Sequence, residues 1–334
     1  MKKKMLALLS AAVLTVSLAA CGGNSASSQA SAPASSAPAA AGYPTKNISV
    51  VVPFNAGSNT DTQMRLFQPY LEKALGPTLV VNNNGASGTI GTTAFLEAPA
   101  DGYTVLFSLP TPTVYKPVTG ETAYAAEDLT PAASLSAAAL YLVVRNDSAY
   151  TTGADLIDYI KANPGAYTYA NAGNGGIAHL AFATFLSGEG LEAVSVPFTG
   201  GTADCYTAVM GGHVESYVCG EQDLAGRDDV RPLINLGTKS EAYPDVPTLA
   251  DLGYDGYGID NFSAFYFRSD VPAELVDAFA AAVETAVNDP AFVSAAAGAG
   301  LELSYKRGSE LSDMIGATVQ SITPVMDTMG LISK

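Results

Sequence analysis

The chain has 334 residues, of which 16 are basic and 32 acidic, and its formal net charge is −16 at pH 7. A chain this acidic does not suit the phosphates of nucleic acids, so a nucleic-acid partner is excluded. The charge favours solubility and its field repels anions, so an anion site must rely on local hydrogen-bond donors. Three cysteines and two histidines show no metal-ligand spacing, and we expect neither a metal nor a cofactor.

The first residues predict an export signal that ends at a lipidation site. Three lysines precede an apolar run at 5–18, which is too short to span a membrane comfortably, and Leu-Ala-Ala then leads to Cys21. This order is typical of a signal peptide at 1–20 and a lipobox, in which Cys21 takes the lipid. The lipid would anchor an extracytoplasmic protein, at the cell surface or in the periplasm, to a membrane that it does not span. The alternative is an ordinary signal peptide with Cys21 present by chance.

Residues 21–42 predict a disordered tether. The stretch 24–42 is almost entirely Ser, Ala and Pro, and this composition cannot bury enough apolar surface to fold. Folding is expected to start near Tyr43, and the remaining length of about 290 residues suggests two α/β lobes. No later segment is apolar and long enough to cross a bilayer.

Strand and helix patterns alternate after residue 43. The first series has strands at 47–54, 78–81 and 103–109 and helices at 60–75 and 88–98, which predicts a βαβαβ unit with a parallel sheet. The second has strands at 140–145, 167–171, 193–198, 214–219 and 230–237 and helices at 155–162, 177–186 and 203–210. A strand at 261–268, a helix at 272–288 and a last helix from residue 309 follow. We predict an α/β fold with lobe one at 43–139 and 240–334, lobe two at 140–239, and a hinged cleft between them.

Loops with small residues follow several of these strands, at the sheet edge where open α/β sheets bind ligands. Small residues let a ligand approach the backbone, and amide groups at helix starts offer donors to an anion. The alternative for the first loop is a helix cap, with Asn59 or Thr60 as the N-cap and Asp61 in the first turn, and we assign Asp61 to capping. The candidate ligand-binding residues are Phe54, Asn55, Ala56, Gly57, Ser58, Asn59, Thr60, Asp61, Ser108, Asn171, Gly173, Asn174, Gly175, Gly176, His179, Thr199, Gly200 and Cys219.

Two other interpretations of these loops are weaker. Gly173, Gly175 and Ala178 match a dinucleotide fingerprint, but the strand that follows ends without the acidic residue that would hold a ribose. A lone histidine such as His179 is more often a structural hydrogen-bonding group than a catalyst. No nucleophile with a matched base is evident, so we do not expect an enzyme.

The chain resembles the solute-binding proteins of tripartite tricarboxylate transporters, the TctC or Bug family. The resemblance covers 43–61, 82–107, 169–185, 196–215 and 243–257, and includes DGYT at 101–104 and DVPT at 245–248. It implies a periplasmic-binding-protein-like fold whose loops at 54–61 and 171–179 grip a small carboxylate through backbone amides and ordered water. It also implies one large and one small membrane subunit as partners, and we expect a monomer.

The chain departs from the family pattern at three points. Ala56-Gly57-Ser58 stands where Ala-Gly-Gly is usual, Cys219 ends a strand that often ends in Asp, and the chain has no Trp. The far half of the ligand is contacted by variable residues, so its identity does not transfer.

Two questions stay open at the level of sequence. The binding event serves either uptake or a sensor that signals to a membrane kinase, whereas an exported hydrolase lacks nucleophilic machinery here. Cys205 and Cys219 are placed on one sheet edge by a right-handed unit, so they form either a disulfide or two buried thiols.

Overall fold

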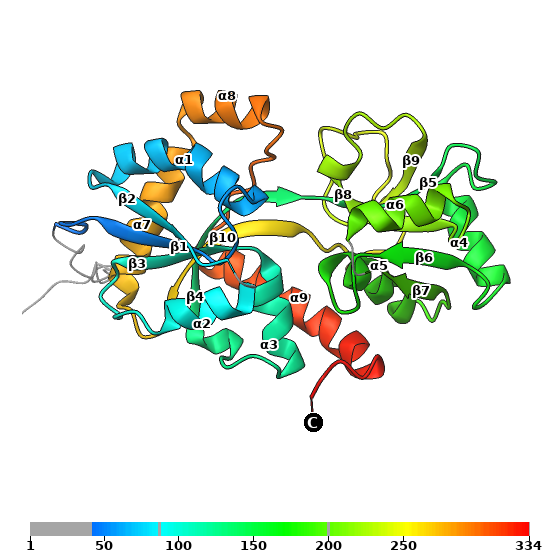
Figure 1. Ribbon diagram of the computed structural model, residues 1–334, viewed down its shortest axis with the longest axis horizontal. Helices are drawn as coiled ribbons and strands as arrows, with labels where there is room; N and C mark the ends of the chain where they lie inside the picture. The colour runs from blue at the N-terminus through cyan, green and yellow to red at the C-terminus, as the bar shows by residue number, and fades with distance from the viewer. Residues whose placement is uncertain (1–41, 86–87, 199–200, 334) are drawn as a thin grey trace, which may run out of the picture. The chain divides into compact units, whose positions relative to one another are not determined.

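A computed structural model describes residues 42–85, 88–198 and 201–333. These residues form two five-stranded sheets, each covered by helices (Figure 1). The expected signal and lipidation site, nearly all of the expected tether, and the candidates Thr199 and Gly200 lie outside the described residues. No helix in the described part of the chain is long and apolar enough to cross a membrane.

The first sheet has the strand order β2-β1-β3-β10-β4. Its strands are β1 (Ile48–Val52), β2 (Leu79–Asn83), β3 (Thr104–Ser108), β4 (Leu129–Ala138) and β10 (Asn261–Arg268). β1 pairs in parallel with β2 and β3, which confirms the predicted βαβαβ unit. β10 is antiparallel to both β3 and β4, and β4 was not predicted from the sequence.

Alternate side chains of the first sheet pack against helices on its two faces. On one face, the strands contact α1 (Asn59–Leu75), α7 (Ala273–Val287) and α8 (Pro290–Gly298), with Val50 and Phe67 among the fully buried residues. On the other face, Leu106 packs with residues of α2 (Gly88–Leu96) and of the π-helical turn at Thr111–Tyr115. A short helix, α3 (Lys116–Thr119), continues that turn. Burial of both faces holds the carboxyl ends of the parallel strands in place.

The second sheet has the order β7-β6-β8-β5-β9. Its strands are β5 (Leu140–Arg145), β6 (Thr168–Asn171), β7 (Val194–Pro197), β8 (Ser216–Gly220) and β9 (Val230–Asn235). β6 is parallel to β7 and β8, as in a second βαβ series, whereas β5 is antiparallel to β8 and β9. Residues of α6 (Thr202–Met210) pack on one face, and residues of α4 (Gly153–Ala162) and α5 (Ile177–Gly188) pack on the other.

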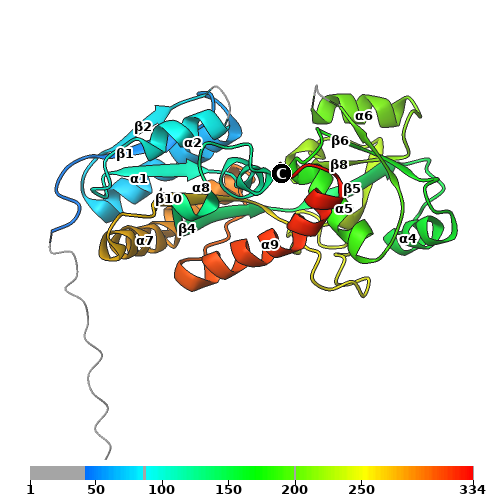
Figure 2. The ribbon, with the colours of Figure 1, turned by 90° about the horizontal axis from the view of Figure 1, so that it is seen from below.

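The chain passes between the sheets at short connections. Only Ala139 separates β4 in the first sheet from β5 in the second, and the chain returns between β9 and β10. The last helix, α9 (Gly308–Thr328), contacts both β4 and α5 and therefore touches elements of both sheets (Figure 2). Beyond it, the Ser333 amide donates to the Thr119 carbonyl at the end of α3 (2.8 Å).

Candidate functional site

Six loops at the carboxyl ends of the parallel strands, here called the junction loops, form the candidate site. Their described residues are 53–58, 84–85 with 88, and 109–112 after β1, β2 and β3, and 172–176, 198 with 201, and 220–223 after β6, β7 and β8. The loops of the first sheet touch closely: a Cβ on Gly85 would lie 2.5 Å from the Asn55 amide, and one on Gly88 would lie 2.9 Å from Pro112 Cγ. Glycine at 85 is therefore needed for the approach of two backbones.

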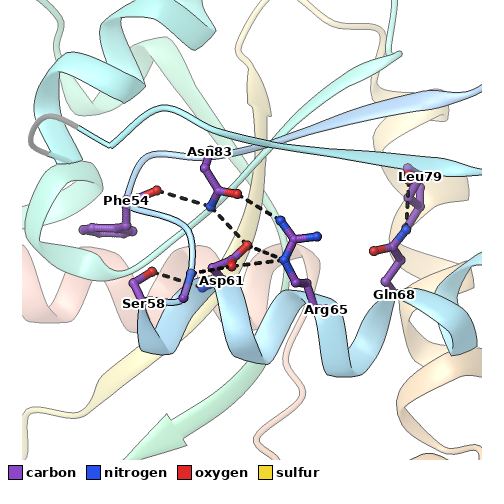
Figure 3. A network of polar contacts seen from close by, with 8 residues as sticks. Phe54, Ser58, Asp61, Arg65, Gln68, Leu79 and Asn83 are labelled. Carbon is purple, nitrogen blue, oxygen red and sulfur yellow. Dashed lines mark hydrogen bonds and ion pairs between the residues drawn. The ribbon is translucent and has the colours of Figure 1, made fainter.

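Asp61 holds the first junction loop in place (Figure 3). Its carboxylate accepts hydrogen bonds from the Gly57 amide (2.8 Å), Arg65 Nε (3.0 Å) and Asn83 Nδ2 (3.0 Å), and the residue is only 2% exposed. The N-cap of α1 is Ser58, whose Oγ accepts from the Asp61 amide (3.3 Å). The prediction of Asn59 or Thr60 as the N-cap was wrong, because a serine one residue earlier reaches the same amide. The position of Asp61 in the first turn is confirmed.

The charge of Asp61 is set by opposing effects. Burial alone would raise its pKa, but the Gly57 amide, Arg65 and Asn83 stabilise the carboxylate and together lower the pKa below the ordinary value of 3.8. All three donors come from within the chain. We infer that Asp61 positions the loop and does not receive a ligand.

The junction loop after β6 is built from glycines and two polar anchors. Gly173 and Gly175 have φ of +121° and +70°, a region in which residues with a Cβ are strained. Asn171 is fully buried; its Oδ1 accepts from the Gly173 amide (3.0 Å) and its Nδ2 donates to Ser195 Oγ (2.8 Å). His179 Nδ1 accepts from the Gly175 amide (3.0 Å). These two buried side chains thus fix the conformation of the loop.

Burial favours the neutral form of His179. It is 4% exposed, and burial lowers its pKa. Because Nδ1 accepts a hydrogen bond, the ring proton of the neutral form lies on Nε2. Its role is to position the loop, which agrees with the structural interpretation from the sequence.

The start of α5 offers free amide donors. The first hydrogen bond of the helix runs from the Leu180 amide to the Gly176 carbonyl (3.0 Å). Within the described residues, the amides of Ile177, Ala178 and His179 have no partner, and no acidic residue lies in the first turn. Three N–H groups at the positive end of a helix dipole form a site for a carboxylate.

Acidic residues lie in the junction loop after β8 and just beyond the junction loop after β7. Asp204 lies in the first turn of α6, and Glu221 and Asp223 lie on the 3-10 turn Glu221–Asp223 after β8. Asp223 Oδ2 accepts from the Gly220 amide (3.2 Å), and burial raises the pKa of Asp223. The amide of Gln222 links the two sheets, because its Oε1 accepts from Asn59 Nδ2 (3.0 Å).

The described candidate residues fall into three groups by exposure. The buried ones are Thr60, Asp61, Ser108, Asn171, His179 and Cys219, which are at most 4% exposed, and Gly175. The exposed ones are Asn55, Ala56, Gly57, Asn59 and Asn174, and the intermediate ones are Phe54, Ser58, Gly173 and Gly176. Among the buried residues, Asp61, Asn171 and His179 accept hydrogen bonds from loop amides, whereas the exposed residues lie where a solute has access. The sequence reasoning did not single out Gln222 or Gly85, although both follow strands of the same two sheets.

Cys205 and Cys219 are free, buried thiols. Burial raises the pKa of both, that of Cys205 to about 11. A thiol with a raised pKa is a poor nucleophile, which suits a role as a small apolar side chain. The structure therefore has the second of the two alternatives that the sequence left open. No group of three or more His, Cys, Asp or Glu residues in the described part of the chain could hold a metal ion.

Comparison with known proteins identifies the family. The profile of the tripartite tricarboxylate transporter family receptors, TctC, matches residues 63–331. BugT of Bordetella pertussis is 31% identical over 220 residues, which make up 64% of this chain and 67% of BugT.

Solved structures agree with this match. A TctC solute-binding protein from Polaromonas, solved without ligand, has a TM-score of 0.76 at 24% identity, covering 86% of this chain and 99% of that one. An R. palustris protein solved with adipate has a TM-score of 0.67 at 25% identity, covering 86% and 98%. The predicted two-lobe fold is thereby confirmed, and the chain belongs to the TctC family of tripartite tricarboxylate transporter receptors.

Proposed function

We propose that this chain is an extracytoplasmic lipoprotein that captures a small carboxylate between lobe one (43–139 and 240–334) and lobe two (140–239). It hands the solute to the large and small membrane subunits of a tripartite tricarboxylate transporter. The observation that carries the proposal is the set of free amides at the start of α5, which follows a loop whose conformation requires glycine. Membership of the receptor family and the adipate in a relative support a carboxylate as the solute.

The proposed contacts use neutral donors. The α5 amides at Ile177, Ala178 and His179 receive the carboxylate from lobe two, and the amides of Asn59 and Thr60 at the start of α1 approach it from lobe one. These two α1 amides also lack a partner among the described residues. Hydrogen bonds from N–H groups to a carboxylate are short and about twice as strong as bonds between neutral groups. Closure of the lobes would exclude water and strengthen them further.

The anchor and the partners belong to the same proposal. Lipid on Cys21 and the tether at 21–42 would keep the binding lobes near the membrane subunits while letting them turn. A Cys21→Ser variant is expected to leave the membrane fraction and appear in the soluble extracytoplasmic fraction. Retention of this variant in the membrane would show that Cys21 is not the anchor.

The test removes one amide donor without changing the backbone. Pro is tolerated at the first position of a helix, and Gly176, the residue before it, has φ −76° and ψ 163°, which suits a following Pro. Ile177→Pro therefore deletes one N–H, and Ile177→Ala is the matched control, because it loses the same side chain but keeps the amide.

Carboxylate binding by the two variants is measured by calorimetry on the mature chain. A hydrogen bond to a charged group contributes about 1.5–3 kcal/mol, so Ile177→Pro should bind about tenfold to a hundredfold more weakly than Ile177→Ala. Equal affinities in the two variants would place the carboxylate elsewhere. Failure of every carboxylate to raise the melting temperature of the unmodified chain would refute carboxylate binding itself.

A sensor that signals to a membrane kinase is the second candidate. It shares the binding step and differs only in the partner. Deletion of the gene should abolish uptake of the labelled solute if the chain serves transport, and should leave uptake intact if it serves sensing.

A further inference from the structure

The chain continues beyond its last helix into a short segment, residues 329–333, here called the C-terminal strap. The Gly330 amide donates to the Asp327 carbonyl (2.9 Å), and Gly330 has φ +67°. The Leu331 amide donates to the Met326 carbonyl, also at 2.9 Å. These two hydrogen bonds around a left-handed glycine form a Schellman motif, which ends a helix and fixes the direction of the residues that follow. The position of Leu331 is therefore set by the way in which α9 ends.

Leu331 lies against the junction loop after β6. A Cβ on Gly175 would lie 3.3 Å from Leu331 Cδ1, which is close packing for a buried glycine. The same neighbours meet again around a cavity of about 730 Å³, because Met329 and Leu331 line it together with Asn174 and His179. The loop is thus held by a polar contact, from its own His179, and by an apolar contact from the far end of the chain.

The end of the strap is attached to a helix that belongs with the first sheet. The Ser333 amide donates to the Thr119 carbonyl at the end of α3 (2.8 Å). A Cβ on Gly120, the next residue, would lie 3.6 Å from Ser333 Cβ, so the strap packs closely there. α9 itself contacts β4 and α3 as well as α5. The strap therefore connects an element beside the first sheet with a binding loop of the second.

We propose that Leu331 is a positioning residue of the carboxylate site. The strap holds its side chain against Gly175 and so keeps the β6 junction loop, and the free amides of α5 that follow it, in the conformation that receives the solute. A loop with glycines at positive φ has many other conformations open to it. Restricting the loop before binding lowers the entropy that the solute must overcome. This inference rests on the proposed function and adds a residue to its site.

The first measurement needs no solute. The Gly175 amide donates to His179 Nδ1 and is buried, so it exchanges its hydrogen with water only when the loop opens. In the mature chain, Leu331→Ala should speed this exchange about tenfold, as NMR would show. Ile315→Ala is the matched control, because Ile315 is also half-buried and packs on the same hydrophobic cluster, but lies in the first half of α9. It should leave the exchange of the Gly175 amide unchanged.

The second measurement is affinity. Acetate, succinate, adipate and citrate are titrated into the wild-type mature chain by calorimetry, and the one that binds most tightly is used for the variants. Leu331→Ala should bind it about threefold to tenfold more weakly, since the loop must then be ordered on binding. Ile315→Ala should bind it as the wild type does. Leu331→Met keeps nearly the same apolar volume and should restore both the slow exchange and the affinity.

Truncation after Ile332 tests the attachment to α3, because it removes Ser333 and keeps Leu331. Faster exchange of the Gly175 amide is expected here too, and an unchanged rate would overturn the role given to that attachment. Equal exchange rates and equal affinities in Leu331→Ala and Ile315→Ala would overturn the positioning role of Leu331. If none of the four carboxylates binds the wild type, the proposed function fails, whereas the exchange rates still decide whether Leu331 holds the loop.

Discussion

Asp61→Asn should destabilise the protein far more than its position near a helix start would suggest. The wild-type carboxylate accepts three hydrogen bonds at 2.8–3.0 Å while almost fully buried. Asparagine keeps one acceptor oxygen and places an NH₂ group where donors already point. Breaking a buried charged network costs about 3–5 kcal/mol, but Arg65 is half exposed and regains water, so we expect a loss of about 2–4 kcal/mol.

Asp155 supplies a matched control. It also stands three residues after its N-cap, Thr152, and forms a capping box with it, but it lies on the exposed surface of α4. Asp155→Asn removes the same charge at the same helix position without burial. Urea unfolding at neutral pH should show a lower midpoint for Asp61→Asn than for Asp155→Asn, with an unchanged denaturant slope. Equal midpoints in the two variants would refute the claim that the buried network stabilises the first loop.

The pH dependence of stability gives an independent check on Asp61. Its pKa in the folded state is lower than the ordinary 3.8, so the unfolded chain binds the proton more readily. The stabilisation is present above the unfolded-state pKa and is lost as the pH falls through the folded-state pKa. The stability difference between wild type and Asp61→Asn should therefore be full at neutral pH and disappear in strong acid. A constant difference down to that range would contradict the charged role of Asp61.

Further predictions concern binding, closure and the thiols. Gly175→Val should lower both the melting temperature and the carboxylate affinity, because φ is +70° and its Cβ would lie 3.3 Å from Leu331 Cδ1. Gly176→Ala, at φ −76°, avoids the positive-φ strain, although its Cβ would lie 3.3 Å from the Gly173 carbonyl oxygen, so it should lower affinity with a smaller loss of stability than Gly175→Val. If the affinity of both variants matched wild type in calorimetry, the β6 junction loop would not be the site. Saturating solute should reduce the radius of gyration in small-angle scattering, and an unchanged radius would argue against hinge closure. Cys205 and Cys219 should both be alkylated after unfolding without reductant, as mass spectrometry would show. An unalkylated chain two hydrogen atoms lighter than the dithiol would instead reveal a disulfide.

The periodic parts of the chain could be predicted from the sequence, and the irregular parts could not. LYLVVR at 140–145 is a continuous apolar run, and the strand found there has the predicted bounds. The strand β4 was missed because its sequence, LTPAASLSAA, has a proline and mostly small residues, which show neither alternation nor an apolar run. The strand is held in place by its pairing with β10 along eight residue pairs, which its own side chains do not predict. The helix α8 was missed for a similar reason: its sequence, PAFVSAAAG, has few large apolar residues, so no apolar helix face is evident.

The candidate site shows the same division. Small residues after strands indicated which loops to consider, since that rule depends only on chain topology. The rule does not distinguish residues that hold a loop in its conformation from residues that contact the solute. From their residue types alone, Asn171 and His179 are plausible ligand-binding residues. In the structure each accepts a hydrogen bond from a loop amide instead, Asn171 from Gly173 and His179 from Gly175. Only the geometry shows that these buried side chains hold the loop in its conformation.

An acidic chain that binds an anion needs donors that bring no counter-charge of their own. Among the described residues, every lysine and arginine except Lys239 is bonded to another group, and Lys239 shares a cavity with Glu221, Glu241 and Glu302. A backbone amide avoids this competition, because its dipole is held in direction by the fold and is neutral overall. The cost is conformational: the loop that precedes the free amides of α5 adopts positive φ at Gly173 and Gly175.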